Sequence, residues 1–164
     1  MTAYNPSEWT DFFVACAGAA AALSGLLFVA VSINVERIVK YEGLADRALE
    51  TIMLLVGALV AALISLVPGQ AAETLGLELL VASGAFMAAI VILINRGVKP
   101  AGAPRSWLIS RIGVSVLGSA PIVIGGLRLI VGSGGGLYWV FAGIVAAMVG
   151  GVLNAWVLLV EILR

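Results

Sequence analysis

The sequence predicts an all-α integral membrane protein, a single bundle of five transmembrane helices that occupies residues 1–164. Composition is the first reason, because 62% of the residues are hydrophobic and only 11% are charged. The mean hydropathy of +1.16 also lies in the membrane class rather than among soluble domains. The second reason is a set of five apolar runs, each close to the roughly 20 residues that cross hydrocarbon as a helix.

The first helix is expected over residues 8–40. Pro6 suits a first helical position and Glu8 suits the first turn, and the run 12–35 carries no charge. Small residues fill its middle, which allows another backbone to lie close. At its far end, polar residues four apart share one face and predict a polar stripe: Ser32, Glu36 and Lys40.

Short connections of turn-forming residues separate the remaining runs. Pro68 and Gly69 close the second run, Pro104 precedes the fourth, and the glycine-rich stretch 132–136 precedes the fifth. Connections this short make successive helices antiparallel neighbours and leave no room for an extramembrane domain. The four further helices are expected at residues 47–67, 74–95, 106–131 and 137–163.

The positive residues indicate the orientation, because short cytoplasmic loops are enriched in Lys and Arg. Of the nine Lys and Arg residues, all but Arg128 fall on one side of the predicted bundle. We therefore expect the N-terminus outside and the C-terminus in the cytoplasm. Acidic residues gather on the outer side: Glu8, Asp11, Glu73 and Glu78.

Three of the predicted helices carry small residues spaced by four, which is typical of close helix–helix contact in membranes. Packing within one bundle explains such stripes, and a seam between copies or with another protein is the alternative. The stripe of the fifth helix is the longest and is the best candidate for an oligomer seam. The stripes are Ala17, Ala21 and Gly25; Gly57, Ala61 and Ser65; and Gly143, Ala147, Gly151 and Ala155.

Polar residues inside the apolar runs are candidates for function, because burying them in lipid is costly. Those near helix ends are expected to be satisfied by pairing or by snorkelling to the interface, with a transport role as the alternative. Arg128 and Glu78 lie at similar predicted depth and form either an ion pair or, for Arg128, a contact with lipid headgroups. The membrane-embedded polar residues are Asn34, Glu50, Glu78, Arg111, Arg128, Asn154 and Glu161.

Several classes of protein fit the sequence poorly. The chain has no His and a single cysteine, Cys16, so the usual ligand sets for transition metals and redox cofactors cannot form within one chain. An intramembrane serine protease needs a His base, and Asp11 and Asp46 lie at opposite helix ends, too far apart for an aspartyl pair. No basic and aromatic surface indicates nucleic acid. We expect no catalytic site, no metal and no cofactor.

The run AGAAAALSGLLFVAVSINVERI at 17–38, with RALE at 47–50 and LVPGQ at 66–70, resembles a group of small multi-pass membrane proteins of bacteria, chiefly actinobacterial. Some of these are labelled modulators of the membrane protease FtsH. The resemblance implies a location in the bacterial plasma membrane and a regulatory or accessory role.

The sequence thus favours a non-enzymatic accessory, scaffold or modulator subunit that packs against other membrane proteins. The alternative is a homo-oligomeric channel or small transporter, with the fifth helix or the polar stripe of the first lining a pore. The expected partners are the lipid bilayer and other integral membrane proteins or a second copy of the chain.

Overall fold

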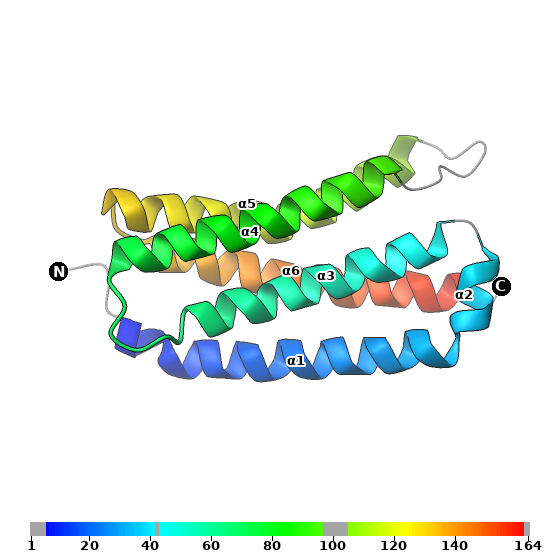
Figure 1. The fold of residues 1–164 in the computed structure, drawn as a ribbon, viewed down its shortest axis with the longest axis horizontal. Helices are drawn as coiled ribbons and strands as arrows, with labels where there is room; N and C mark the ends of the chain where they lie inside the picture. Colours follow the sequence, from blue (N-terminus) through cyan, green and yellow to red (C-terminus); the bar gives the residue numbers. More distant parts are fainter. Residues whose placement is uncertain (1–5, 42, 97–104, 163–164) are drawn as a thin grey trace.

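The computed structural model describes residues 6–41, 43–96 and 105–162, and every regular element among them is helical (Figure 1). A short 3-10 helix, η1, leads into six α-helices. Their bounds are η1 Pro6–Trp9, α1 Thr10–Ile33, α2 Val35–Lys40, α3 Leu44–Ile64, α4 Ala72–Arg96, α5 Arg105–Val131 and α6 Gly136–Ile162.

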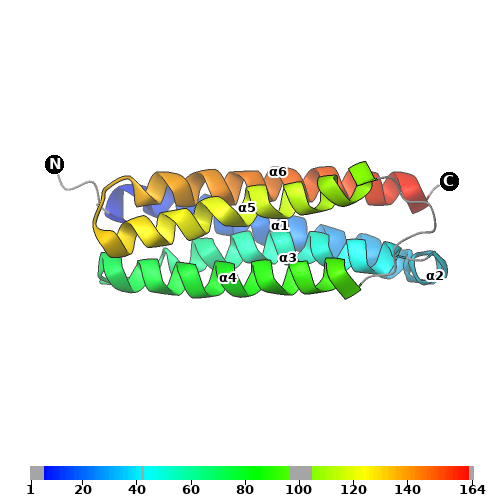
Figure 2. The ribbon, with the colours of Figure 1, turned by 90° about the horizontal axis from the view of Figure 1, so that it is seen from above.

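Five of these helices, α1, α3, α4, α5 and α6, are long and apolar enough to cross a membrane. This confirms the predicted set of five long helices, with bounds within three residues of expectation for the last four. All five run along one common direction, as the two perpendicular views show (Figures 1 and 2). Consecutive long helices pack side by side, as their short connections predict.

The first helix was predicted to run unbroken to Lys40, but α1 ends at Ile33. Asn34 follows with φ −104° and ψ 14°, and its Nδ2 donates to the Ala30 carbonyl at 2.9 Å. An Asn side chain that bonds nearby backbone offers the chain an alternative to the regular helix, which accounts for the break. The predicted stripe of Ser32, Glu36 and Lys40 is therefore divided between α1 and α2.

The short helix α2 lies across one end of the bundle (Figure 1). Its Ile38 is buried in a small cluster with Leu44 and Ala48 of α3 and Leu158 of α6. This cluster fixes α2 to the two helices beneath it. The charged side chains Glu36, Arg37 and Lys40 are exposed.

Helix α3 is the structural centre, since it packs against α1, α4 and α6. Helix α5 packs extensively against both α4 and α6, so the last three helices form a tight group. Helix α1 lies along one edge, with α3 as its main neighbour (Figure 1). The other described helices therefore leave its long outer surface uncovered.

Glycines bring α4 and α5 into direct backbone contact. A Cβ added at Gly76 would lie 2.6 Å from the Gly126 carbonyl oxygen, and one added at Gly126 would lie 2.7 Å from the Gly76 carbonyl oxygen. Side chains at these positions would force the helices apart. The sequence analysis missed this crossing, because Gly76 and Gly126 belong to none of the three stripes of small residues that it named.

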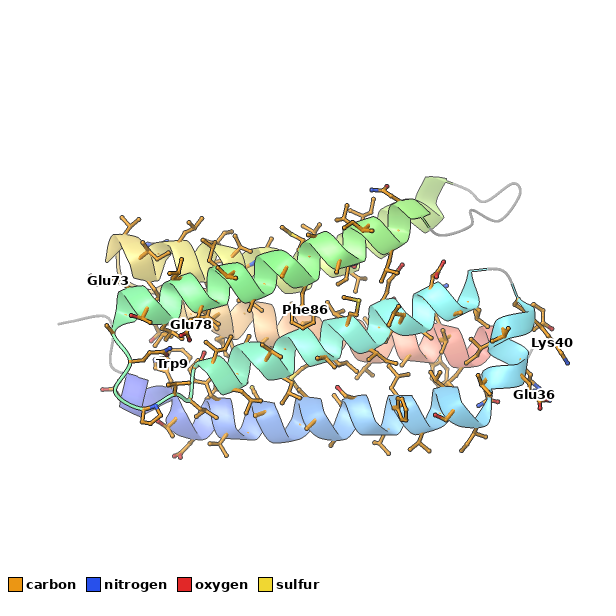
Figure 3. All side chains as sticks on the ribbon, viewed as in Figure 1. Trp9, Glu36, Lys40, Glu73, Glu78 and Phe86 are labelled. Atoms are coloured by element: carbon orange, nitrogen blue, oxygen red, sulfur yellow. The ribbon has the colours of Figure 1, made fainter. Side chains whose placement is uncertain are left out.

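The two ends of the bundle differ in charge. Trp9, Glu73 and Glu78 lie at one end, and Glu36 and Lys40 lie at the other (Figure 3). The acidic residues that the sequence analysis assigned to one side thus do share one end. The assignment of that end to the cell exterior stays a prediction.

Candidate functional site

The stripe of α6 is used inside the chain and is not a surface for another protein. Gly143 packs on Ile122 and Ala147 is 2% exposed. At Gly151 an added Cβ would lie 2.6 Å from Leu55 Cδ2. These residues seat α6 against α5 and α3, while Ala155 is half-buried. The expectation that α6 offers the best oligomer seam is therefore wrong, since internal packing already occupies its stripe.

The stripe of α3 is also internal. An added Cβ at Gly57 would lie 3.5 Å from the Phe86 ring of α4, which points toward α3 (Figure 3). Ala61 is buried, and the buried Ser65 donates from its Oγ to the Ala61 carbonyl at 2.8 Å. The close approach of α3 to its neighbours thus uses this stripe.

The stripe of α1 has a different environment. Ala17 is half-buried, whereas Ala21 and Gly25 are exposed. A Cβ added at Gly18 or Gly25 would meet no atom within 4 Å. Every exposed position from Ala15 to Gly25 is Ala or Gly, and the exposed Val14 and Leu26 border this stretch. We call this surface the α1 small-residue face: Ala15, Gly18, Ala19, Ala21, Ala22 and Gly25.

A group of polar side chains is buried in α3 near α2. Glu50 is 3% exposed, Arg47 is 8% exposed, and the fully buried Thr51 donates to the Arg47 carbonyl at 2.8 Å. Glu50 and Arg47 both have polar or electrostatic partners. Glu50 therefore lies inside the bundle rather than snorkelling to its surface, and Arg47 and Thr51 join it although the sequence analysis did not single them out.

This group continues into α5, which runs parallel to α3 because α4 lies between them in the chain. Leu54 of α3 contacts the position of Gly118, so the buried Ser115 of α5 lies about level with Thr51. One turn further along, a cavity of about 20 Å³ lies between α3, α4 and α5 and includes Ser83 and Ser119 in its lining. That volume holds about one water molecule, so this cavity is not a binding site for a larger solute.

The remaining polar candidates are spread over separate places. Asn34 bonds its own helix end, as described above, and Asn154 is half-buried on α6. The side chains of Arg111 and Glu161 lie outside the part of the chain whose side chains are described. The structure therefore does not gather into one site those predicted polar residues whose side chains it describes.

Arg128 and Glu78 have different partners and do not form the ion pair that we considered. Arg128 Nε donates to the Gly134 carbonyl at 3.2 Å, within the turn that follows its own helix. Glu78 accepts a hydrogen bond from Gln70 Nε2, in the connection before α4. Each charged side chain thus bonds the connection adjacent to its own helix. This arrangement differs from both predicted alternatives, the ion pair and the contact of Arg128 with lipid headgroups.

Aromatic side chains join the start of α1 to the start of α6. The Trp9 and Tyr138 rings are 4.9 Å apart at an interplanar angle of 84°, and the Phe12 and Phe141 rings are 5.2 Å apart. These residues and Glu8 line a groove of about 390 Å³. The groove is far larger than the cavity between α3, α4 and α5.

No cluster of three or more His, Cys, Asp or Glu that could hold a metal ion occurs within the described part of the chain. Cys16 is a buried free thiol in the packed core.

The chain matches no protein-family model, no curated protein and no solved structure. Function must therefore be argued from the molecule itself.

Two surfaces stand out by their chemistry. The α1 small-residue face offers another helix a close approach. The aromatic groove offers ring surfaces beside a carboxylate.

Proposed function

We propose that this chain is a non-enzymatic accessory, scaffold or modulator subunit of the bacterial plasma membrane, which packs against a helix of another membrane protein. The observation that carries the proposal is the exposure of the α1 small-residue face. The small-residue stripes of α3 and α6 pack against other helices of the chain, whereas Gly18 and Gly25 of α1 face open space. Transmembrane helices associate through small residues that let backbones approach, so this face suits a partner helix.

The location of α1 supports the same proposal. Helix α1 lies at the edge of the bundle and packs mainly on α3, so a partner can reach its outer face without displacing any helix. The proposed partner is an integral membrane protein, and a second copy of this chain is one form that it can take. The resemblance to small bacterial proteins labelled as FtsH modulators agrees with such a role.

The test compares two substitutions that differ only in which face they enlarge. Gly25→Leu places a large side chain on the α1 small-residue face, and Gly84→Leu places one on α4, where an added Cβ also meets no atom within 4 Å. At both positions the Cβ has open space, so neither substitution forces a backbone contact apart. We expect both variants to keep the thermal stability of the wild-type chain in mild detergent.

The readout is co-purification from membranes solubilised in mild detergent, with size measured by multi-angle light scattering. We expect the wild type and Gly84→Leu to elute with a partner or as a defined oligomer, and Gly25→Leu to lose it. The proposal is wrong if the wild type elutes alone as a monomer, or if the two variants behave alike.

A further inference from the structure

The cavity between α3, α4 and α5 lies in the middle of the bundle. Ser83 and Ser119 are in its lining, and Ser83 lies midway along the apolar span Ala72–Asn95 of α4. Both serines are buried, with 7% and 6% of their surface exposed. Two hydroxyl-bearing side chains from neighbouring helices thus line a space of about 20 Å³ at the centre of the bundle.

The two serines come from helices that run antiparallel and in direct contact. A Cβ added at Gly126 of α5 would lie 3.2 Å from the Leu80 backbone nitrogen of α4, so these two residues are about level. Ser83 follows Leu80 and Ser119 precedes Gly126, which places the two serines about one helical turn apart along the bundle. Two hydrogen bonds in sequence span about 5 Å, so one small molecule between the serines reaches both.

The two hydroxyl groups have complementary capacity left. A serine hydroxyl has one proton to donate and two lone pairs to accept with. Ser83 donates its proton to the Leu79 carbonyl, which leaves its lone pairs for a donor. Among the described residues, none forms a hydrogen bond with the Ser119 side chain. Since buried hydroxyls in proteins are nearly always bonded, Ser119 requires a partner that lies in the cavity.

We propose that this cavity binds one water molecule, which bridges Ser83 of α4 and Ser119 of α5. The Ser119 hydroxyl donates its proton to the water oxygen, and the water donates one of its own to the Ser83 Oγ. A buried water needs roughly 10–15 Å³ and about two to four polar partners. The volume of about 20 Å³ and the two hydroxyls meet both conditions.

The rest of the lining determines which helices the water joins. The described residues that line the cavity are all uncharged, so a cation has no counter-charge there. The lining from α3 is apolar and offers no side-chain partner: Met53, Leu54, Gly57 and Ala58. The water therefore links α4 to α5 through hydrogen bonds and only contacts α3.

The first experiment is X-ray radiolysis of the full chain in an uncharged maltoside detergent, followed by mass spectrometry. X-rays convert bound water into hydroxyl radicals, which oxidise the side chains beside it. Met53 lines the cavity, whereas Met148 is also half-buried but lies outside this lining. Ser119→Val removes the hydroxyl partner and adds a methyl group in its place. We expect Met53 to lose most of its oxidation in this variant and Met148 to keep the wild-type rate.

The second experiment is a double-mutant cycle measured by thermal unfolding. Ser83→Ala and Ser119→Ala each remove one end of the bridge, so the double variant should lose less Tm than the two single losses combined. Ser65→Ala is the matched control, because the buried Ser65 bonds the Ala61 carbonyl of its own helix and lies outside this lining. The losses from Ser65→Ala and Ser119→Ala should add, since these two residues share no partner.

Three outcomes overturn the proposal. Absence of Met53 oxidation in the wild type would show that the cavity is dry. Oxidation of Met53 that persists in Ser119→Val would show that the radicals come from bulk water. Additive losses from Ser83→Ala and Ser119→Ala would show that each hydroxyl bonds only within its own helix.

Discussion

The contact between Gly76 of α4 and Gly126 of α5 gives the sharpest stability prediction. Gly76→Ala would place a Cβ 2.6 Å from the Gly126 carbonyl oxygen, 2.9 Å from Ile130 Cγ1 and 3.0 Å from Leu129 Cβ. The nearest of these atoms belongs to the backbone, so no rotamer change relieves the clash. The two helices must separate.

The size of the effect follows from that distance. Ordinary contact begins at 3.4 Å, so the backbones must move apart by about 0.8 Å at the crossing. Overpacking of this kind typically costs about 1–3 kcal/mol. A glycine-to-alanine change within a helix also stabilises by up to about 1 kcal/mol, which works in the opposite direction.

A matched control separates the two effects. Gly84→Ala lies in the same helix and adds a Cβ that meets nothing within 4 Å, so it reports the helix propensity alone. The difference between the two variants should therefore be the cost of the crossing, about 2 kcal/mol. The assay is thermal unfolding in one detergent, in which Gly76→Ala should lower Tm relative to Gly84→Ala by roughly 4–8 °C.

A double variant tests the mechanism rather than the magnitude. Once Gly76→Ala has parted the helices, Gly126→Ala should cost less than it does alone, because both added atoms need the same separation. The reasoning fails if Gly76→Ala and Gly84→Ala are equally stable, or if the costs at Gly76 and Gly126 simply add.

Three further predictions follow from the polar residues. Because Arg128 and Glu78 bond different connections, the losses in Tm from Arg128→Glu and Glu78→Arg should add, and recovery in the double exchange would show that they are paired after all. Glu50→Ala removes a buried carboxylate from its partners and should lower the free energy of unfolding by about 3 kcal/mol, and an unchanged denaturation midpoint in detergent would contradict that burial. In intact bacterial cells, the cysteine of Ser133→Cys should react with an impermeant maleimide and the cysteine of Lys40→Cys should not. The opposite labelling would show that the proposed topology is inverted.

The number of long helices could be predicted from the sequence because it depends on length and hydropathy alone. The break at Asn34 could not, because it lies within an uncharged run and depends on whether one side chain bonds the helix end. The crossing of Gly76 and Gly126 was missed for a related reason. It depends on the register of α4 against α5, which no spacing within a single helix reveals.

The candidate sites were predictable to a smaller degree. The small-residue spacing identified helices that pack closely, and in α3 and α6 it marked internal contacts. The spacing of small residues could not show which stripe would be exposed on the surface of the bundle, because exposure depends on which helices are its neighbours. Arg128 and Glu78 were predicted to lie at similar depth, yet each side chain bonds a partner that is closer to it in sequence.

The contrast between the exposed surfaces of α1 and α4 explains why only one of them suggests a partner. Both helices have 22% of their apolar window buried, so exposure alone does not distinguish them. On α4 the exposed positions include Leu77, Val81 and Ile92, large side chains that acyl chains solvate well. Between Ala15 and Gly25 of α1 every exposed position is Ala or Gly, which offers lipid little contact area but lets another backbone come close. Hydrophobic burial does not drive helix association within lipid, so close packing of small residues is the main source of affinity there. Helix α1 carries such residues on the surface that faces away from the bundle.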